Sequence, residues 1–423
     1  MTDGKADTGR SRNLWHNTDF TKLWGGETLS QVGSQITLLV LPLIAILHLD
    51  AGAEQLGWLK AAQTAPVLVI ALLAGVWLDN HRRRPLLVLT NLGRAALLGL
   101  IPLLFLADGL TLAAVLVISA LIGTLTVCFD IGYVSYLPTL VERDQLVSAN
   151  ARLESTYSIA EIGGPGLGGL LVGLLAAPFV LLADAMTYLL AAIGISRIKR
   201  VEPQPPPRQS PSLWRDMREG VRFTFRDGHL RILAAQSAVF NCFEQAILTL
   251  YLLYGIETLG LSASLLGGLL AAGSAGALAG ALFAGRIGRR TGSGGATVLA
   301  MAISSVSLFA VPAATGAPAA VITILLAGLV LHGAGLAVFN VYALSIRAEI
   351  VPSHHLSRVT GSYRLVIDGA VPLGGLLGGY LGAFAGLRAA MWLCGACLTI
   401  SCVLFAFSRM RYYRGPETET RSA

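Results

Sequence analysis

The sequence predicts an all-α membrane protein in which twelve transmembrane helices form two pseudo-symmetric six-helix bundles. Hydrophobic residues make up 54% of the 423-residue chain and charged residues only 13%, whereas soluble domains carry about a quarter charged residues. A transmembrane helix needs about 20 apolar residues, and about twelve such runs follow one another here. We divide the chain into an N-terminal bundle at 1–196, a central loop at 197–229 and a C-terminal bundle at 230–423.

Short polar turns separate the predicted spans, apart from the longer central loop. What remains outside the spans is too short to hold a soluble domain. The predicted spans cover residues 22–47, 56–78, 86–107, 111–137, 150–175, 178–196, 231–256, 264–285, 295–314, 319–346, 361–385 and 388–408.

Positive charge is distributed unequally along these spans. If the N-terminus is placed inside, 28 of the 31 lysines and arginines lie in or beside inner segments, and the exceptions are Lys60, Arg94 and Arg388. Loops rich in lysine and arginine stay in the cytoplasm, so both termini are predicted to be cytoplasmic. The net charge of +7 follows from this topology, and nucleic-acid binding is not expected.

The central loop begins with a proline-rich run at 203–207, which cannot form a helix. Between 213 and 226, apolar residues at near-helical spacing oppose a set of arginines. This pattern predicts an amphipathic helix on the inner membrane surface. The alternative is a loosely ordered tether between the two bundles.

An internal repeat relates the two halves. Glu161 stands four residues before Pro165 in the fifth span, and Asp368 stands four residues before Pro372 in the eleventh, at an offset of 207 residues. The basic turn after the second span has a counterpart after the eighth span, at a similar offset along the chain. Repeated halves with interrupted helices are typical of secondary transporters.

The turn after the second span is short and strongly basic. It contains Gly75, Asp79, Arg83 and Arg84 in the pattern Gly-x-x-x-Asp-x-x-x-Arg-Arg. This pattern resembles the loop between helices 2 and 3 of the major facilitator superfamily. The resemblance implies that the aspartate and the arginines form a latch that opens and closes during transport.

The fifth span contains Gly164, Pro165, Gly168 and Gly169. The order of these residues resembles the fifth-helix motif of proton-coupled exporters in the same superfamily. Glycines four residues apart allow two helices to approach closely, and a proline leaves a backbone carbonyl free within a span. Close packing here would seal one side of a central pathway. The alternative is an ordinary glycine contact between helices.

Carboxylates inside spans are costly and are therefore functional candidates. Glu161 and Glu244 lie near mid-membrane, on helices that the resemblance places around a central cavity. They are the first candidates for handling protons or a cationic substrate. Asp368 is the repeat partner of Glu161, and Glu27 lies nearer the inner surface, where solvation alone would explain it. Each acid could instead be neutral and hydrogen-bonded between two helices.

Arg94 in the third span and Asp130 in the fourth lie at about the same depth, roughly 12 Å from the inner ends of their helices. The two helices are sequence neighbours and antiparallel. An ion pair is the least costly way to keep both charges in the membrane. We therefore predict that the two side chains pair, with a structural or gating role.

No metal or cofactor site is expected. Cys394 and Cys397 form a Cys-x-x-Cys pattern, but they lie in an apolar helix without a second pair, which favours packing. His332, in the tenth span, is a weaker functional candidate. The sequence contains no nucleotide-binding loop, so a proton gradient is the expected energy source.

Further motifs resemble the exporter branch that includes macrolide-efflux proteins and the enterobactin exporter. They are Leu23-Trp24, Ser30-Gln31, Leu137-Pro138 and the stretch 351–358. The resemblance implies proton-coupled export of an amphiphilic small molecule, such as a drug, antibiotic or siderophore, by a monomer in a bacterial inner membrane. The alternatives are uptake of a metabolite by proton symport, and a non-transporting sensor or scaffold. An enzyme is not expected, because the intramembrane acids are scattered.

Overall fold

The computed structural model describes residues 14, 17–70, 82–142, 145–200, 202, 213–352 and 356–413. Within these ranges the chain is helical and contains no strand, so the predicted all-α class is confirmed. The helices of the first half are α1 (Thr18–Leu49), α2 (Ala53–Thr64), α4 (Arg83–Leu106), α5 (Leu112–Leu140), α6 (Leu146–Leu174) and α7 (Ala177–Ser196). The later helices are α8 (Leu213–Arg226), α9 (Gly228–Leu253), the π-helix η3 (Tyr254–Thr258), α10 (Ala263–Ser307), α11 (Ala310–Ala313), α12 (Pro318–Ile350), α13 (Leu356–Ala385), α14 (Leu387–Ala406) and the 3-10 helix η4 (Arg409–Tyr412).

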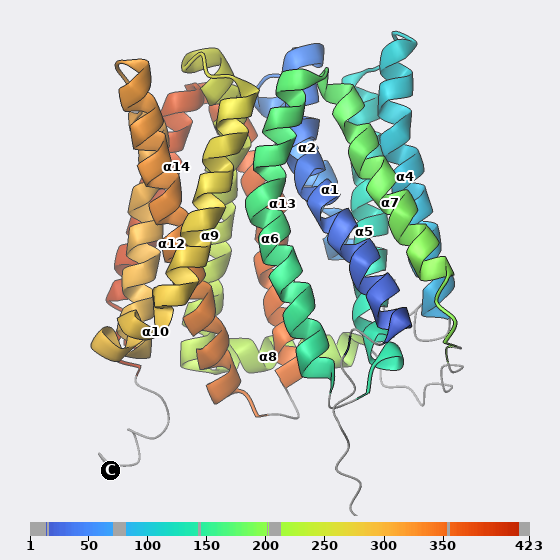
Figure 1. Ribbon diagram of the computed structural model, residues 1–423. Coiled ribbons are helices and arrows are strands. Elements are labelled where there is room, and N and C mark those ends of the chain that lie inside the picture. The colour runs from blue at the N-terminus through green and yellow to red at the C-terminus, as the bar shows by residue number, and fades with distance from the viewer. Residues whose placement is uncertain are drawn as a thin grey trace, which may run out of the picture.

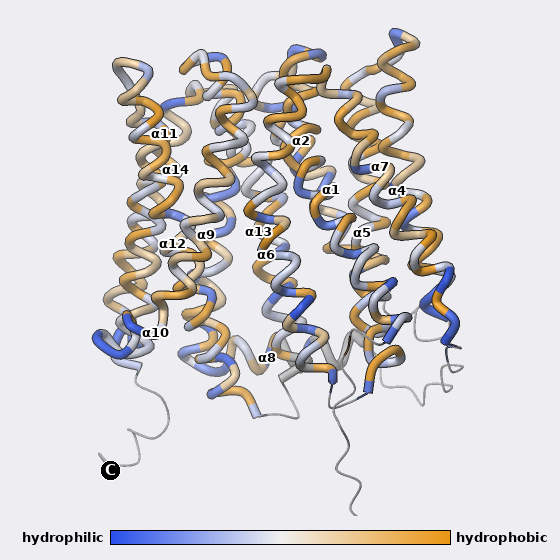
Figure 2. Tube along the Cα trace, viewed as in Figure 1, coloured by the Kyte–Doolittle hydropathy of each residue, from blue (hydrophilic) through white to orange (hydrophobic). Residues whose placement is uncertain are grey.

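The long helices run side by side along a common axis, and α8 lies across their lower ends (Figure 1). Apolar residues cover most of their length, while hydrophilic residues gather at the lower end (Figure 2). Within the described ranges, nine helices are long and apolar enough to cross a membrane. Because α10 contains two predicted spans, and α2 and α6 match two more, the arrangement accommodates the twelve expected spans.

Polar side chains define where several of these helices begin. The carboxamide oxygen of Asn17 accepts a hydrogen bond from the backbone N–H of Phe20 at the start of α1. Thr111, Asp227 and Ser262 cap α5, α9 and α10 in the same way. Such caps satisfy N–H groups that have no partner within the helix.

One boundary differs from the expected one. The predicted spans 264–285 and 295–314 are joined in the single element α10, and the second ends in the short α11. Gly292 interrupts α10 with φ 74° and ψ 165°, a conformation that glycine adopts without steric cost. The two spans are therefore separated by a kink at one glycine rather than by a loop.

The amphipathic helix expected in the central loop is confirmed as α8. Phe223 of α8 packs on a small apolar cluster formed by Leu230, Val351 and Val359. This cluster belongs to the lower ends of the second-half helices in Figure 1, so α8 is held against that end of the bundle.

The two halves touch through small residues at the upper end of the bundle. A Cβ atom on Gly57 of α2 would lie 2.7 Å from the carbonyl oxygen of Gly375 on α13. A Cβ on Gly267 of α10 would lie 2.6 Å from the carbonyl oxygen of Pro165 on α6. Backbones approach this closely only where side chains are absent, so glycines set the contact between the halves.

Candidate functional site

Three cavities lie among the helices that surround the centre of the molecule. The largest, of about 560 Å³, is lined mainly by α9, α12 and α13, with Tyr157 from α6 on its wall. The second, of about 340 Å³, is lined by first-half helices together with Asp368 and Val371 of α13. The third, of about 210 Å³, lies between α1, α2, α9 and α10. Each cavity therefore has walls from both halves of the chain.

Asp368 is the predicted acid that the structure places on these cavities. The residue is exposed and lines both of the larger ones. Arg364, one helical turn earlier on α13, lines the largest cavity as well. Asp368 thus lies on the walls of both larger cavities, and its carboxyl group is accessible to a bound molecule.

Glu244 is buried between helices instead of facing a cavity. It is 8% exposed, and its Oε1 lies 2.8 Å from Nε2 of His332 on α12. Nδ1 of His332 lies 2.9 Å from Oγ of Ser304 on α10, and the imidazole stacks on Phe240 with ring centroids 6.3 Å apart. A hydrogen-bonded chain therefore joins α9, α12 and α10.

The partnership of His332 with Glu244 was missed by sequence reasoning. The sequence shows only that both residues are titratable and lie within predicted spans, and this does not indicate that they contact each other. Their contact depends on which sides of α9 and α12 face each other, and hydropathy does not define those sides in helices that are apolar on all sides.

The remaining two candidate acids differ in exposure. Glu161 on α6 is exposed and lies outside the linings of the three cavities, one turn after Tyr157, which lines the largest. Glu27 on α1 is only 7% exposed, so the expectation that solvation accounts for it is wrong. Its Oε1 accepts a hydrogen bond of 2.6 Å from Nε2 of Gln31, while Oε2 has no partner among the described residues.

The predicted ion pair between Arg94 and Asp130 is not formed. The Arg94 side chain donates to Oδ1 of Asn91 at 2.7 Å. Its Cζ lies 4.4 Å from the ring centroid of Phe129 and 4.2 Å from that of Tyr188. Asp130 is exposed on another side of α5. Two residues at the same depth in the membrane do not always meet. Successive side chains on a helix point in directions about 100° apart, so Phe129 can face Arg94 while Asp130 does not.

The helix-5 glycines pack α6 on both sides. Cβ atoms added to Gly164 and Gly168 would meet Gln35 and Leu39 of α1, and one on Gly169 would lie 3.0 Å from the carbonyl oxygen of Ser264 on α10. The motif therefore joins α6 both to its own half and to the opposite half. This agrees with the close packing expected from the sequence.

The described part of the basic turn contacts the start of the central loop. Both carboxylate oxygens of Glu202 accept from the backbone N–H of Arg83, at 2.9 and 2.8 Å, and Oε1 also accepts from its guanidinium at 3.2 Å. Arg84 donates to the carbonyl oxygens of Ile195 and Ser196 at the end of α7. The other two predicted latch residues, Gly75 and Asp79, lie outside the described residues.

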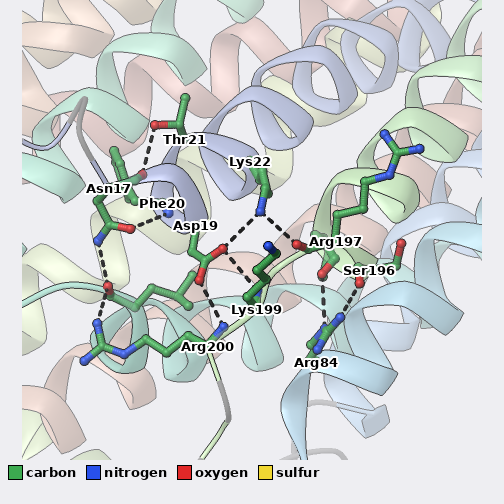
Figure 3. Close-up of polar contacts among 12 residues, drawn as sticks. Asn17, Asp19, Phe20, Thr21, Lys22, Arg84, Ser196, Arg197, Lys199 and Arg200 are labelled. Carbon is green, nitrogen blue, oxygen red and sulfur yellow. Dashed lines mark hydrogen bonds and ion pairs between the residues drawn. The ribbon is translucent and has the colours of Figure 1, made fainter.

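Asp19 of α1 fixes the same loop from the other side (Figure 3). Its carboxylate accepts from the backbone N–H groups of Lys199 and Arg200 at 3.1 and 3.0 Å, and from Nζ of Lys22 at 3.2 Å. The Arg200 guanidinium in turn donates to the carbonyl oxygen of Leu140 at the end of α5. The start of α1 and the end of α5 are thus both bonded to the segment that follows α7.

The described residues offer cavities and titratable groups rather than a metal centre. Among the residues that the structure describes, no group of three or more His, Cys, Asp or Glu side chains is placed to hold a metal ion. Cys394 and Cys397 are free thiols. What the arrangement offers is a set of cavities between two helical halves, with a few buried or cavity-facing titratable groups.

With this fold and these cavities, the family model and the curated relatives identify the chain as a transporter of the major facilitator superfamily. Within that class, the chain belongs to the transmembrane secretion effector family, whose family model matches residues 14–422.

Curated relatives support this assignment, and solved structures share the fold. The chain is 26% identical to the multidrug efflux pump Tap of Mycolicibacterium fortuitum over 370 residues, which are 84% of this chain and 87% of that protein. It is 28% identical to Tap of Mycobacterium tuberculosis over 375 residues, 85% of this chain and 86% of that protein. A bacterial homologue of the iron transporter ferroportin in its inward-facing state superposes with a TM-score of 0.74 at 17% identity, covering 95% and 100% of the two chains. The nucleoside transporter NupG gives 0.72 at 13% identity, covering 93% and 99%.

Proposed function

We propose that this protein is a proton-coupled secondary active exporter of amphiphilic small molecules, such as drugs, antibiotics or siderophores, and that it works by alternating access. The observation that carries the proposal is the pair of larger cavities between the halves, with Asp368 on the wall of both. The relatives named multidrug efflux pumps support the direction and the kind of cargo.

The lining of the second cavity suits an amphiphilic molecule. Leu38, Leu41 and Ile122 are among the apolar residues that form much of its wall, and Gln63 and Asp368 are among the polar groups. Binding sites for small molecules are generally apolar with a few placed polar groups that orient the ligand. A molecule with an apolar body and one or two polar or charged groups fits this description.

The packing between the halves supports access from one side at a time. Gly57 and Gly267 hold the halves in contact near the end where α1 finishes. The largest cavity is lined by Arg347 and Thr360, which lie close to the opposite helix ends. We assign that opposite end to the cytoplasm because the lysines and arginines gather there. An exporter would load its cargo from this side.

Energy would come from protons moving inward as cargo moves outward. Glu27, Glu161, Glu244 and Asp368 are the intramembrane acids that could carry them. We expect both termini to be cytoplasmic, and we take the monomer as the functional unit because the cavities lie within one chain.

Direction and coupling are tested in a bacterial host that lacks its own efflux pumps. Cells that express the chain should resist members of a panel containing a macrolide, a tetracycline and ethidium. Inside-out membrane vesicles energised with a proton gradient should accumulate ethidium, and a protonophore should abolish this. Asp368→Asn should lose most of the activity, while Glu257→Gln, an exposed acid on η3, serves as the control. Gradient-driven ethidium accumulation in intact cells would instead show import.

A further inference from the structure

The contact between Glu244 and His332 has the geometry of a proton-sharing pair. Oε1 and Nε2 are 2.8 Å apart, a distance that requires a proton between them. Both residues are buried, at 8% and 7% exposure. A proton held here is therefore shielded from bulk solvent while it moves between the two sides of the membrane.

Ser304 allows His332 to exist in two protonation states without displacement of heavy atoms. The Ser304 hydroxyl can donate to an unprotonated Nδ1 at 2.9 Å, or it can turn to the His332 carbonyl oxygen at 3.2 Å. In the second arrangement, a protonated Nδ1 donates to the oxygens of Ser304, of which the carbonyl lies 3.3 Å away. An imidazole needs both kinds of partner if it is to gain and lose one proton.

A cation from the opposite half lies near this pair. Lys60 of α2 lines the smallest cavity together with Gln245, the residue that follows Glu244. Its stem lies against α13, where a Cβ on Gly375 would be 2.8 Å from Cβ and Cγ of Lys60. Glu244 is the acid whose charge acts on Lys60. Lys60 therefore lies at the contact between the two halves, and the Glu244 carboxylate acts electrostatically on its ammonium group.

The other elements around the pair contribute glycines, thiols and apolar residues at this level. On α13 the residues against α9 at this level are Gly374 and Gly378, and Asp368 stands more than a turn away on the cavity walls. From α14 the buried thiol of Cys394 faces α9, whose own Cys242 lies nearby. Among the residues of α1 and α10 that line the smallest cavity, none is titratable.

We propose that Glu244, His332 and Ser304 form the proton-carrying site of this transporter, and that Lys60 couples the charge of that site to closure of the outer end. This inference rests on the proposed function. Loading adds one proton to the imidazole at Nδ1 and changes the net charge of the pair from −1 to zero. No other bond forms or breaks, and the proton is released in the reverse step.

The coupling follows from electrostatic attraction. When the outer end is closed, α2 rests on α13 and the Lys60 ammonium stays near the pair, which favours the unloaded, negative state. The proton then leaves toward the cytoplasm. When the outer end opens, α2 moves away from α13, the attraction weakens, and the pair takes up a proton from outside. Protons thus move inward during the steps that move cargo outward.

The test measures opening of the outer end as a function of pH and needs no cargo. Spin labels are attached to Ala176→Cys and Thr315→Cys, both exposed in outer turns of opposite halves, in a background without the five native cysteines. Their distance is measured by double electron–electron resonance in lipid nanodiscs from pH 5 to pH 9. In the otherwise unchanged protein, lower pH should shift the population toward the longer distance with a single midpoint.

Four variants separate a coupling role from a structural one. His332→Asn should abolish the pH dependence, and Glu244→Gln should move its midpoint to lower pH because the carboxylate that favours the protonated imidazole is gone. Lys60→Met should favour the open state at every pH. Ser304→Ala keeps the carbonyl acceptor but loses the hydroxyl that donates to an unprotonated Nδ1, so the midpoint should move to higher pH. Glu257→Gln should leave the titration unchanged. Wild-type titration curves in Glu244→Gln and His332→Asn would overturn the proposal.

The outcome is distinguishable from failure of the proposed function. If the chain confers no resistance and moves no ethidium, but the distance still titrates through Glu244 and His332, the proton site stands and the export proposal falls. The opposite result is intact export with a spin-label distance that does not depend on pH, or that depends on pH without Glu244 and His332. In that case other residues carry the protons, and this inference is wrong.

Discussion

The carboxylate of Glu202 joins the backbone N–H and the guanidinium of Arg83, and so attaches the start of the central loop to the first turn of α4. The backbone N–H of Arg84 also donates to Glu202, at 3.2 Å. An anion at the N-terminus of a helix is stabilised by the unpaired N–H groups and by the helix dipole. The basic turn that resembles a latch is therefore in direct contact with the segment that connects the two halves.

We expect Glu202→Gln to destabilise the first half by about 1–2 kcal/mol, because hydrogen bonds to a charged acceptor are stronger than those to a neutral one. Thermal unfolding in detergent, followed by thiol-reactive dye fluorescence, measures the loss. Glu142→Gln is the control, since Glu142 is exposed on an inner turn nearby. Equal unfolding temperatures for the two variants would contradict a role for this contact.

Asp79→Asn should reduce export severely while membrane expression stays near normal. The reason is that a latch residue interacts with its partners in one conformation of the cycle only, so its loss changes the balance between states rather than folding. Ethidium efflux and quantitative immunoblotting of membranes check the two quantities. Unchanged efflux would remove Asp79 from the mechanism.

Arg94 and Asp130 should show only weak coupling in a double-mutant cycle, because no contact joins their side chains. Arg94→Met removes a buried cation held between two rings and is expected to cost about 2 kcal/mol. Asp130→Asn changes an exposed group and should stay within about 0.5 kcal/mol. The coupling energy from thermal unfolding of the singles and the double should lie below about 0.5 kcal/mol. A larger value would show that the two charges meet in another conformation.

Adjacent glycines on α10 provide a matched pair for the contact between the halves. A Cβ on Gly267 would lie 2.6 Å from the carbonyl oxygen of Pro165, whereas one on Gly268 would meet nothing within 4 Å. Gly267→Ala should separate α10 from α6, raise the open population in the spin-label measurement and lower export. Gly268→Ala should leave both unchanged, or slightly stabilise the helix. Identical behaviour of the two variants would show that the contact is not tight in the membrane.

Part of the candidate site followed from sequence. Asp368 was predicted from its position in the repeat, and the structure places it on two cavities. Glu244 was selected as an intramembrane acid, but its partners His332 and Ser304 come from other helices, 88 and 60 residues along the chain. Sequence patterns in single helices carry no information on such partners, because the helices are apolar on most sides.

The sequence by itself determined the all-α membrane class, the order of the helices and the amphipathic helix α8, and it predicted on which side of the membrane the positive charge lies. These depend on the cost of placing polar groups in lipid, which each segment meets separately. Only the tertiary structure decided that Phe129 rather than Asp130 faces Arg94, and that Glu244 meets His332 while Lys60 approaches from the other half. Those contacts depend on the rotation of each helix about its axis, which packing between helices sets.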